Sequence, residues 1–298
     1  MKKLIRCLFA ALLLFTAVGC STNTTTNEPE GTKLTVATFN IDAKSQPDVV
    51  AQSKLMSEHE VDIVGLQEVD NKTKRNNYDV VEKFLNDTFK DGYFTNCIGF
   101  QGGGYGIATI SMHKFTDTSE TKLFSDLFKG KELAEELKVA YMNHDPEKPE
   151  TDVALDAVSE KGPVEPRCFQ RVVFEKDGKQ IAFYNTHLSY EDMNLRKKQM
   201  ETLKAAMDKD TCDYVIAVGD FNADQSTKEF DLFKEDYNLS NGKDGKWLDT
   251  YNGEDDTMKV NSVDNVIVTK NISIDKVEML NSGLSDHNPL VVNLTIEE

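Results

Sequence analysis

The stretch VDIVGLQEV, at residues 61–69, decides the fold class of the chain. Its apolar, β-rich first half predicts a buried strand. Glu68 follows this strand, and a carboxylate near the low-dielectric end of a sheet is costly unless another group offsets its charge. A bound metal ion or a partner group must therefore lie beside Glu68.

Short β-rich runs alternate with helical patterns from about residue 31 onward. The expected strands are at residues 34–41, 61–69, 106–112, 168–175, 180–188, 214–222, 262–269 and 289–296. Helices fit residues 48–60, 77–91 and 131–142, and a further helix lies within 191–210. One face of that last helix is apolar, which predicts that it packs on the core. The face consists of Met193, Met200, Leu203 and Met207. The class is therefore α/β with large sheets.

Composition excludes several classes of protein. The chain has 298 residues, 39% of them hydrophobic, and a formal net charge of −17. Ample apolar content, one long apolar run and only five cysteines exclude a disordered protein, a polytopic membrane protein and a disulfide-dense miniprotein. The acidic balance argues against a protein that grips polyphosphate by bulk positive charge. An enzyme that recruits a cation can still act on phosphate.

The first 19 residues predict a cleaved export signal. Lys2, Lys3 and Arg6 precede an apolar run that is too short to span a bilayer. The following AVGC resembles a bacterial lipobox, so Cys20 is expected to carry lipid, and residues 20–32 form a flexible tether. The expected location is a bacterial cell envelope, on the outer face of a membrane. The alternative is an ordinary secretory signal in which Cys20 is incidental.

Three cysteines remain in the expected domain, namely Cys97, Cys168 and Cys212. Their spacing fits neither a zinc site nor a disulfide framework, so we expect buried small hydrophobic side chains. One bridge with one spare thiol is the alternative outside the cytoplasm. A further segment, residues 117–166, is acidic, carries most of the prolines and separates two expected strands. It is either a functional lid or a solvated ornament, and we favour the ornament.

Groups that bind hard cations or move protons stand at the ends of five expected strands. They are Asn40 and Asp42 in TFNID, Glu68 in LQEV, His187 in NTHL, Asp220 and Asn222 in GDFN, and Asp286 and His287 in SDHNP. Oxygen ligands suit Mg²⁺ or Mn²⁺ and do not suit zinc. The expected ligands of such an ion are Asn40, Asp42, Glu68 and Asp286. GDFN alone could be a plain turn, so the hypothesis depends on all the motifs together.

Six motifs in order resemble the endonuclease/exonuclease/phosphatase superfamily, which includes pancreatic deoxyribonuclease, neutral sphingomyelinases and inositol-polyphosphate 5-phosphatases. They are TFNID, LQEV, NTHL, GDFNAD, SVDNVIV and SDHNP, and the resemblance spans about residues 33–296. It implies one domain over residues 33–298, folded as a four-layer α/β sandwich of two packed mixed β-sheets flanked by helices. The active site would lie at one edge, where strand ends converge.

The resemblance also implies a role for each matched residue. Glu68 would be the principal metal ligand, with Asn40, Asp42 and Asp286 around the cation. Asp220 and Asn222 would handle the attacking water, and Asp264 would orient His287. His187 would be the second histidine, and Arg167 would hold a phosphate oxygen. The chain departs from the family in two places. No acid is evident as a partner for His187, where residues 102–106 are glycine-rich, and Asn265 follows Asp264 where the family has an aromatic residue.

We therefore expect a divalent-metal-dependent phosphohydrolase, most simply a phosphodiesterase. Its substrate would be DNA, a phospholipid head group or a phosphorylated small molecule. The protein would be a monomer that touches the membrane only through its lipid anchor. The alternative is a surface binding or adhesion module that keeps the sandwich without catalysis.

Overall fold

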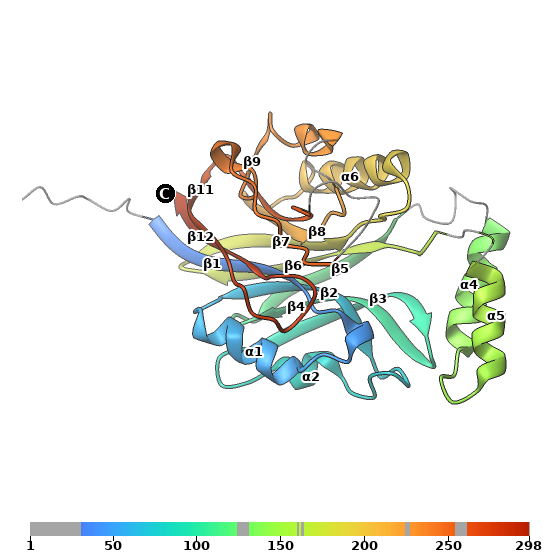
Figure 1. Cartoon of the computed structure of the whole chain (residues 1–298). Coiled ribbons are helices and arrows are strands. Elements are labelled where there is room, and N and C mark those ends of the chain that lie inside the picture. The colour runs from blue at the N-terminus through green and yellow to red at the C-terminus, as the bar shows by residue number, and fades with distance from the viewer. Residues whose placement is uncertain are drawn as a thin grey trace, which may run out of the picture.

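Two six-stranded mixed β-sheets pack face to face, and helices cover their outer surfaces in the computed structural model (Figure 1). The structure describes residues 31–123, 131–159, 161, 164–223, 227–253 and 261–297. The expected α/β sandwich is confirmed. The expected export signal at residues 1–19, Cys20 and the tether up to residue 30 lie outside the described residues, and strand β1 already begins at Gly31. In the described ranges no helix has both the length and the apolar character needed to cross a membrane.

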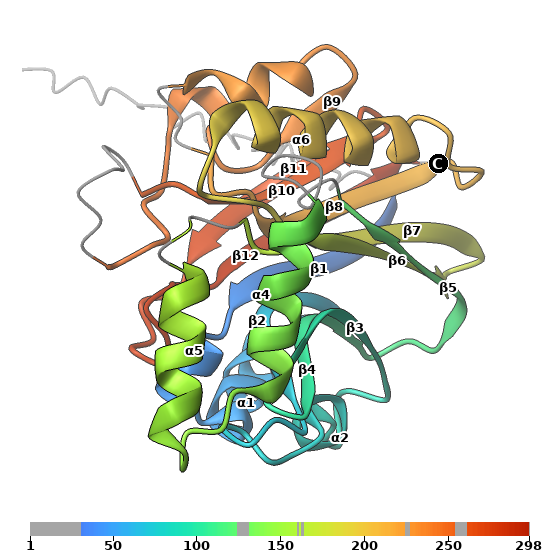
Figure 2. The same ribbon diagram turned by 90° about the vertical axis from the view of Figure 1, so that its right-hand side faces the viewer.

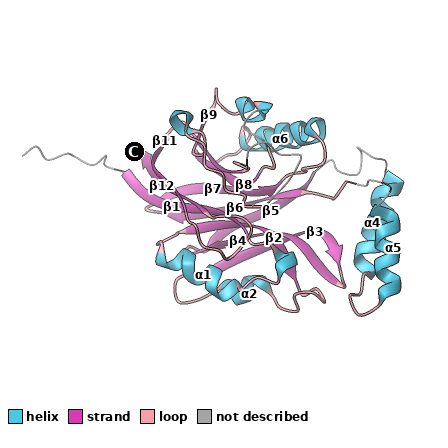
Figure 3. Ribbon diagram, viewed as in Figure 1, coloured by secondary structure: helices cyan, strands magenta, loops and turns pink. Residues whose placement is uncertain are grey.

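The first sheet, sheet A, has the strand order β11-β12-β1-β2-β4-β3. Its strands are β1 (Gly31–Asn40), β2 (Ile63–Asn71), β3 (Asp91–Phe100), β4 (Gly103–Ser111), β11 (Ile272–Met279) and β12 (Leu290–Glu297). Strands β1 and β2 are parallel, and the other neighbours are antiparallel. Helices α1 (Val49–Glu58) and α2 (Val80–Phe84) cover the outer face of this sheet (Figure 3).

The second sheet, sheet B, has the order β5-β6-β7-β8-β10-β9. Its strands are β5 (Phe115–Lys122), β6 (Cys168–Lys176), β7 (Lys179–His187), β8 (Tyr214–Asp220), β9 (Tyr237–Leu239) and β10 (Asp264–Thr269). Strands β7 and β8 are parallel. Helix α6 (Met193–Met207) and the short 3₁₀ helix η3 (Glu229–Leu232) pack on the outer face. Two further 3₁₀ turns are η1 (Ala43–Ser45) and η4 (Lys243–Gly245).

A helical hairpin of α4 (Lys131–Asn143) and α5 (Pro149–Ser159) stands beside one end of the sandwich (Figure 2). It lies in the acidic segment 117–166, whose first residues, 117–122, belong to the edge strand β5. Whether the segment acts as a lid stays a prediction.

The central strands are buried on both faces. In β1, Leu34 and Val36 join Ile63 of β2 in the core between the sheets, whereas Ala37 and Phe39 join the cluster under α1. Side chains of a strand point alternately to its two faces, so a strand that is covered on both faces must have apolar residues at both sets of positions. This explains why the decisive stretch reads as a nearly continuous apolar run.

A buried amide joins the two sheets close to the ends of their central strands. Asn185 of β7 donates through Nδ2 to the backbone oxygens of Leu66 (3.1 Å) and Ala108 (2.8 Å), and its Oδ1 accepts from Gln67 Nε2 (2.8 Å). Gly65 makes this approach possible, because a Cβ there would lie 2.8 Å from the Asn185 side chain. The two sheets are thus joined by polar bonds beside the strand ends.

The expected helix at residues 77–91 is wrong in length. Helix α2 ends at Phe84, and the side-chain oxygen of Asn86 accepts hydrogen bonds from the backbone nitrogens of Thr88 (2.6 Å) and Phe89 (2.9 Å). Asparagine often forms such local turns, which compete with helix formation. The polypeptide then enters strand β3 at Asp91.

Strands β3, β5, β9 and β11 are additional to the expected set. Strand β5 shows the reason, because every residue after Phe115 is exposed and the strand therefore has no apolar face to recognise. In α6 the predicted core face is confirmed for Met200, Leu203 and Met207, which are buried, whereas Met193 is wrong, with half of its surface exposed.

The expectation that all three cysteines are reduced hydrophobic side chains is also wrong. Cys97 of β3 and Cys168 of β6 form a disulfide with a Cα–Cα separation of 5.6 Å, and Cys212 is a free thiol. Cys97 lies at a register shift in β3 and Cys168 is the first residue of β6, so the bridge joins the two sheets. A disulfide of this kind is typical of proteins that fold outside the cytoplasm.

Replacing Asn185 by leucine should destabilise the fold by roughly 2–4 kcal/mol, because it leaves buried hydrogen-bonding groups of Leu66, Gln67 and Ala108 without this partner. Urea unfolding measures the effect. The matched control is Asn143→Leu at an exposed site on α4, which should change the free energy of unfolding by less than about 0.5 kcal/mol. Equal losses in the two variants would contradict the role of the buried amide.

Candidate active site

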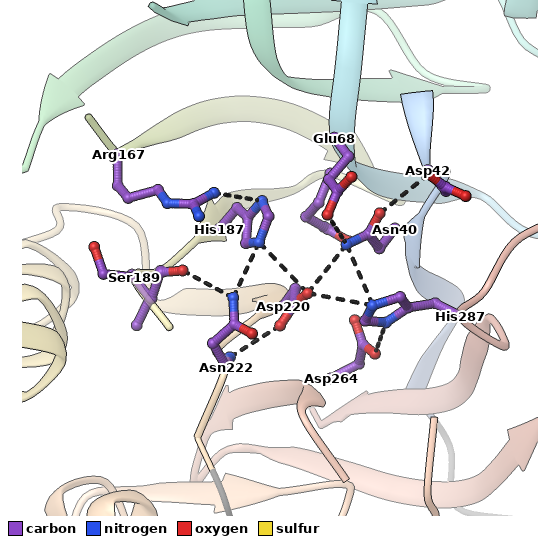
Figure 4. Close-up of polar contacts among 12 residues, drawn as sticks. Asn40, Asp42, Glu68, Arg167, His187, Ser189, Asp220, Asn222, Asp264 and His287 are labelled. Atoms are coloured by element: carbon purple, nitrogen blue, oxygen red, sulfur yellow. Dashed lines mark hydrogen bonds and ion pairs between the residues drawn. The ribbon is translucent and has the colours of Figure 1, made fainter. Parts of the chain in front are cut away.

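Strand ends from both sheets meet at one edge of the sandwich and bring the predicted polar residues together (Figure 4). Asn40 ends β1, while His187 and Asp220 end the parallel strands β7 and β8. Asp264 begins β10 directly opposite Asp220, because these two strands are antiparallel. Residues far apart in the chain therefore lie within hydrogen-bonding distance of one another.

Glu68 reaches this edge through an irregularity in β2. The pairing of β2 with β4 shifts between Leu66 and Val69, and Glu68 adopts the left-handed region with φ of 52°. A bulge of this kind redirects a side chain, and positive φ in a residue other than glycine is a local strain that often accompanies functional sites. Here it directs the Glu68 carboxylate at Asn40, whose Nδ2 donates to Oε1 at 3.1 Å.

The amide of Asn40 connects the two sheets at the site. Its Nδ2 also lies 3.1 Å from Asp220 Oδ2, and its Oδ1 accepts a hydrogen bond from the backbone nitrogen of Asp42 at 3.1 Å. In this orientation the amide presents nitrogen to the carboxylates, so ligation of a cation through oxygen requires the amide to turn.

Asp264 and His287 form a buried dyad. Asp264 Oδ2 lies 2.8 Å from His287 Nδ1, and the opposite ring nitrogen, Nε2, lies 3.7 Å from Asp220 Oδ2. Burial alone would lower the pKa of His287, but the negative charges of Asp264 and Asp220 raise it to about 10. His287 is therefore an imidazolium at neutral pH, with Nε2–H directed into the site.

Arg167 is the partner of His187 that the sequence did not reveal. Its Nη1 lies 3.0 Å from His187 Nδ1, and the same nitrogen pairs with Glu165 at 3.1 Å. Because a guanidinium has only donors, Nδ1 must accept, and the proton of the neutral imidazole sits on Nε2. Burial and the positive charge of Arg167 lower the pKa of His187 well below its ordinary value.

Asn222 lies on the other side of His187. Its backbone nitrogen donates to Asp220 Oδ1 at 2.9 Å, and its Nδ2 donates to the backbone oxygen of Leu188 at 2.9 Å. That Nδ2 is also 3.1 Å from His187 Nε2, a contact that adds no hydrogen bond while Nε2 keeps its proton. Asn222 therefore fixes the loop after β8 and the direction of the Asp220 carboxylate.

Three carboxylates crowd this space, of which Asp220 is buried, Glu68 is partly buried and Asp286 is exposed. Burial raises the pKa of Glu68 to about 7, and the charges of Asp220 and Asp286 contribute. Burial and the charge of Asp264 raise the pKa of Asp220 to about 6, and burial also raises the pKa of Asp286. A divalent cation would stabilise the ionised forms of all three, so the donor set fits a metal ion.

The described residues contain one close group of acid and histidine ligand atoms, formed by Asp220, Asp264 and His287 within 4.8 Å of one another. This group is consistent with a metal site. Asp42 departs from the expected arrangement, because its carboxylate caps η1 by accepting from Ser45 and is turned away from Glu68 (Figure 4).

The site is a hollow of about 240 Å³. Seven of the predicted residues line it, namely Glu68, Arg167, His187, Asp220, Asn222, Asp286 and His287. Sequence reasoning missed Tyr105, Glu165, Tyr190, Tyr251 and Val263, which also line it. Only Glu165 had a local signal, since an acid two residues before a buried arginine is a natural ion-pair partner.

The ring states can be tested by ¹⁵N-resolved NMR of the metal-free protein. His187 should remain neutral with its proton on Nε2 at the mildly acidic pH where an ordinary histidine is protonated, while His287 stays doubly protonated until near pH 10. Asp264→Asn removes the charge that holds the His287 proton, so the pKa of His287 should fall. A proton on Nδ1 of His187 would contradict the assignment to Arg167.

Comparison with known proteins supports the family resemblance. The model of the Endonuclease/Exonuclease/phosphatase family matches residues 37–287, whereas none of the curated proteins matches the sequence. An endonuclease/exonuclease/phosphatase family protein from Bacteroides thetaiotaomicron has a similar structure, with a TM-score of 0.62, 17% identity, and coverage of 90% of this chain and 100% of that chain.

Two further solved structures have informative names. Mannosyl-6-phosphatase from Bacteroides thetaiotaomicron is 18% identical with a TM-score of 0.57, over 88% of this chain and 99% of that chain. TDP2 from D. rerio, complexed with a single-strand DNA product, is 14% identical with a TM-score of 0.57, over 89% and 99% of the two chains. At such identities these structures show a shared fold alone. The match over residues 37–287 shows more: this chain belongs to the Endonuclease/Exonuclease/phosphatase family.

Proposed function

We propose that the protein is a divalent-metal-dependent phosphohydrolase and that its substrate is a phosphodiester. The observation that carries the proposal is the convergence of Glu68, Asp220 and Asp286 beside the imidazolium of His287 in one hollow of about 240 Å³. Carboxylates that repel one another call for a cation, and a cation next to a fixed proton donor suits phosphoryl chemistry.

The residues that would hold the cation are Glu68 and Asp286, with Asn40 after its amide turns. An all-oxygen set of this kind suits Mg²⁺ or Mn²⁺. Asp42 would act through the backbone, since its nitrogen fixes the Asn40 amide and its carboxylate is engaged by Ser45. When bound, the cation would neutralise charge on the phosphate and on the departing oxygen.

The remaining roles follow from the protonation of each group. Asp220, with a pKa near 6, is the group best placed to accept a proton from the attacking water, and Asn222 holds its carboxylate in position. His287 and His187 both present Nε2–H and would donate hydrogen bonds to phosphate oxygens. Arg167 keeps His187 in that tautomer, which is a different role from the direct phosphate contact that the resemblance implied.

The balance of charge favours a diester over a monoester. His187 is neutral, Arg167 is paired with Glu165, and His287 is paired with Asp264, so the cationic side chains among the described residues that line the hollow are already balanced by carboxylates. One divalent cation then matches the single negative charge of a diester better than the double charge of a monoester. The substrate would be DNA, a phospholipid head group or a phosphorylated small molecule.

The proposal extends to the location of the protein. The disulfide between Cys97 and Cys168 supports folding in an oxidising compartment, in agreement with the export signal expected at residues 1–19. We propose that lipid on Cys20 then anchors the protein to the outer face of a bacterial membrane.

The activity can be tested with a chromogenic bis-aryl phosphodiester and Mg²⁺ or Mn²⁺. The wild type should turn over and EDTA should abolish turnover, whereas Glu68→Gln should raise the half-saturating Mg²⁺ concentration by about tenfold or more. The matched control is Glu58→Gln on the exposed side of α1, which should leave the titration unchanged. An unchanged titration for Glu68→Gln would place the cation elsewhere, and absence of turnover in the wild type would favour the adhesion module.

Anchoring can be tested by expressing Cys20→Ser in a bacterial host. The wild type should incorporate labelled palmitate and sediment with membranes, whereas the variant should lose the label and appear in the soluble exported fraction. Membrane sedimentation of both forms would contradict lipidation of Cys20. Cys7→Ser, within the expected signal, is the matched control and should behave as the wild type.

A further inference from the structure

A second hollow, of about 750 Å³, opens beside the active site. We call it the hairpin cleft, because one wall comes from α4 and α5 and the other from the β3–β4 turn and the loops after β1 and β2. Its lining includes Lys44, Gln46, Phe100, Tyr141, Leu155 and Asp156. It shares Glu68, Tyr105 and Glu165 with the catalytic hollow, so the two spaces are continuous.

The helical wall of the cleft is fixed to the sandwich. Gln101, in the β3–β4 turn, donates from its backbone nitrogen to the backbone oxygen of Tyr141 (2.8 Å), and its Nε2 lies 2.8 Å from His144 Nδ1. Lys74 forms an ion pair with Asp145 between the two helices. These contacts fix the width of the cleft, and a cleft of fixed width can select ligands by their shape.

The cleft has aromatic walls. The rings of Phe100, Tyr105 and Tyr141 are only partly covered, and Phe100 and Tyr141 meet edge to face with centroids 5.4 Å apart. The Arg75 guanidinium lies over the Phe100 ring at 4.6 Å and the His144 ring stacks on it at 6.0 Å, so Tyr105 and Tyr141 are the rings of these three that remain for a ligand. Flat side chains of this kind bind the faces of rings, and a base stacked on an aromatic side chain gains about 1–3 kcal/mol.

The charges of the cleft exclude a polyanionic occupant. Arg75 is held by two hydrogen bonds to Asp70, at 2.7 and 2.9 Å, and Lys74 by its ion pair with Asp145. Among the described lining residues, Lys44 is then the remaining lysine or arginine, and the same lining contains the acids Glu68, Asp156 and Glu165. A chain of phosphates needs several unpaired cations along its path, and the cleft does not offer them. Carboxylates and the Gln46 amide suit hydroxyl or N–H donors instead.

We propose that the hairpin cleft binds the part of the substrate on one side of the scissile phosphate and selects a single uncharged ring that carries hydrogen-bond donors. Such a ring is found in a sugar or in a nucleoside. The inference rests on the proposed phosphodiesterase function, since it places the phosphate at Glu68 and its ring-bearing alcohol between the aromatic walls. A long nucleic-acid strand or a lipid tail does not fit this description.

The test compares three methyl phosphodiesters, those of thymidine, of glucose at C6 and of ethanol, with the alcohol released measured by chromatography. The wild type should prefer one ring ester over the ethyl ester by at least about tenfold in kcat/KM. The variants are Tyr141→Ala, which removes a wall, and Leu155→Arg, which fills the space. Matched controls on the same helices are Val139→Ala and Val153→Arg, at sites that are 58% and 69% exposed.

Both cleft variants should reduce the ring preference about tenfold and leave the rate on the ethyl ester within about twofold, whereas the controls keep the preference. The thymidine and glucose arms distinguish the two kinds of ring. A preference that survives in both cleft variants, or a wild type that treats all three esters alike, overturns the inference.

Failure of the proposed function gives a different result, namely no hydrolysis of any ester by the wild type. Calorimetric binding of the same thymidine and glucose methyl phosphodiesters then decides the inference without turnover. The proposed cleft is supported if the wild type and Val153→Arg bind either compound and Leu155→Arg binds it at least about tenfold more weakly. Absence of binding to the wild type, or equal binding by Leu155→Arg, overturns it.

Discussion

The polar contact that Asn185 makes between the two sheets is the constraint on which the site depends. Asn185 can bond to the backbone of β2 and β4 only because Gly65 has no side chain. This contact fixes the ends of β7 and β8 relative to those of β1 and β2. The distances of about 3 Å between Asn40, Glu68 and Asp220 follow from it, because each of these residues sits at or next to the end of a strand so fixed. A small change in sheet spacing would separate the two halves of the site.

Electrostatic interactions within the site give its two histidines different charges. Two histidines face the same carboxylate, Asp220, at 3.5 and 3.7 Å, yet Asp264 keeps one of them charged and Arg167 keeps the other neutral. In both rings Nε2–H points into the same space. The group that contacts Nδ1, Asp264 or Arg167, therefore sets the charge of the ring without changing which nitrogen donates. Carboxylates with raised pKa values complete a site that is unfavourable without a cation and suited to one with it.

The sequence predicted the central strands and the gathering of their end residues well, because apolar runs and strand-end acids are local patterns. It failed where the structure depends on distant partners. The role of Arg167 beside His187 was hidden, since only the β6–β7 pairing brings the two together. The disulfide from Cys97 to Cys168 joins different sheets, and spacing alone could not pair these residues. The edge strand β5 has no apolar face, so its pairing with β6, and not its composition, makes it a strand. Asp42 carries the expected residue type, but its side chain is used by a local cap.

The disulfide has a consequence for how the molecule can diversify. It links residues 71 positions apart, and the α4–α5 hairpin lies wholly inside the loop that it closes. The cross-link restricts the unfolded chain by an amount worth about 4 kcal/mol for a loop of this size, and that amount changes only slowly with loop length. Helices inside the loop can therefore lengthen, shorten or be exchanged while the sheets stay tied at the same two points. The hairpin can therefore be exchanged without altering the two sheets, and relatives could acquire a different ligand selectivity in this way.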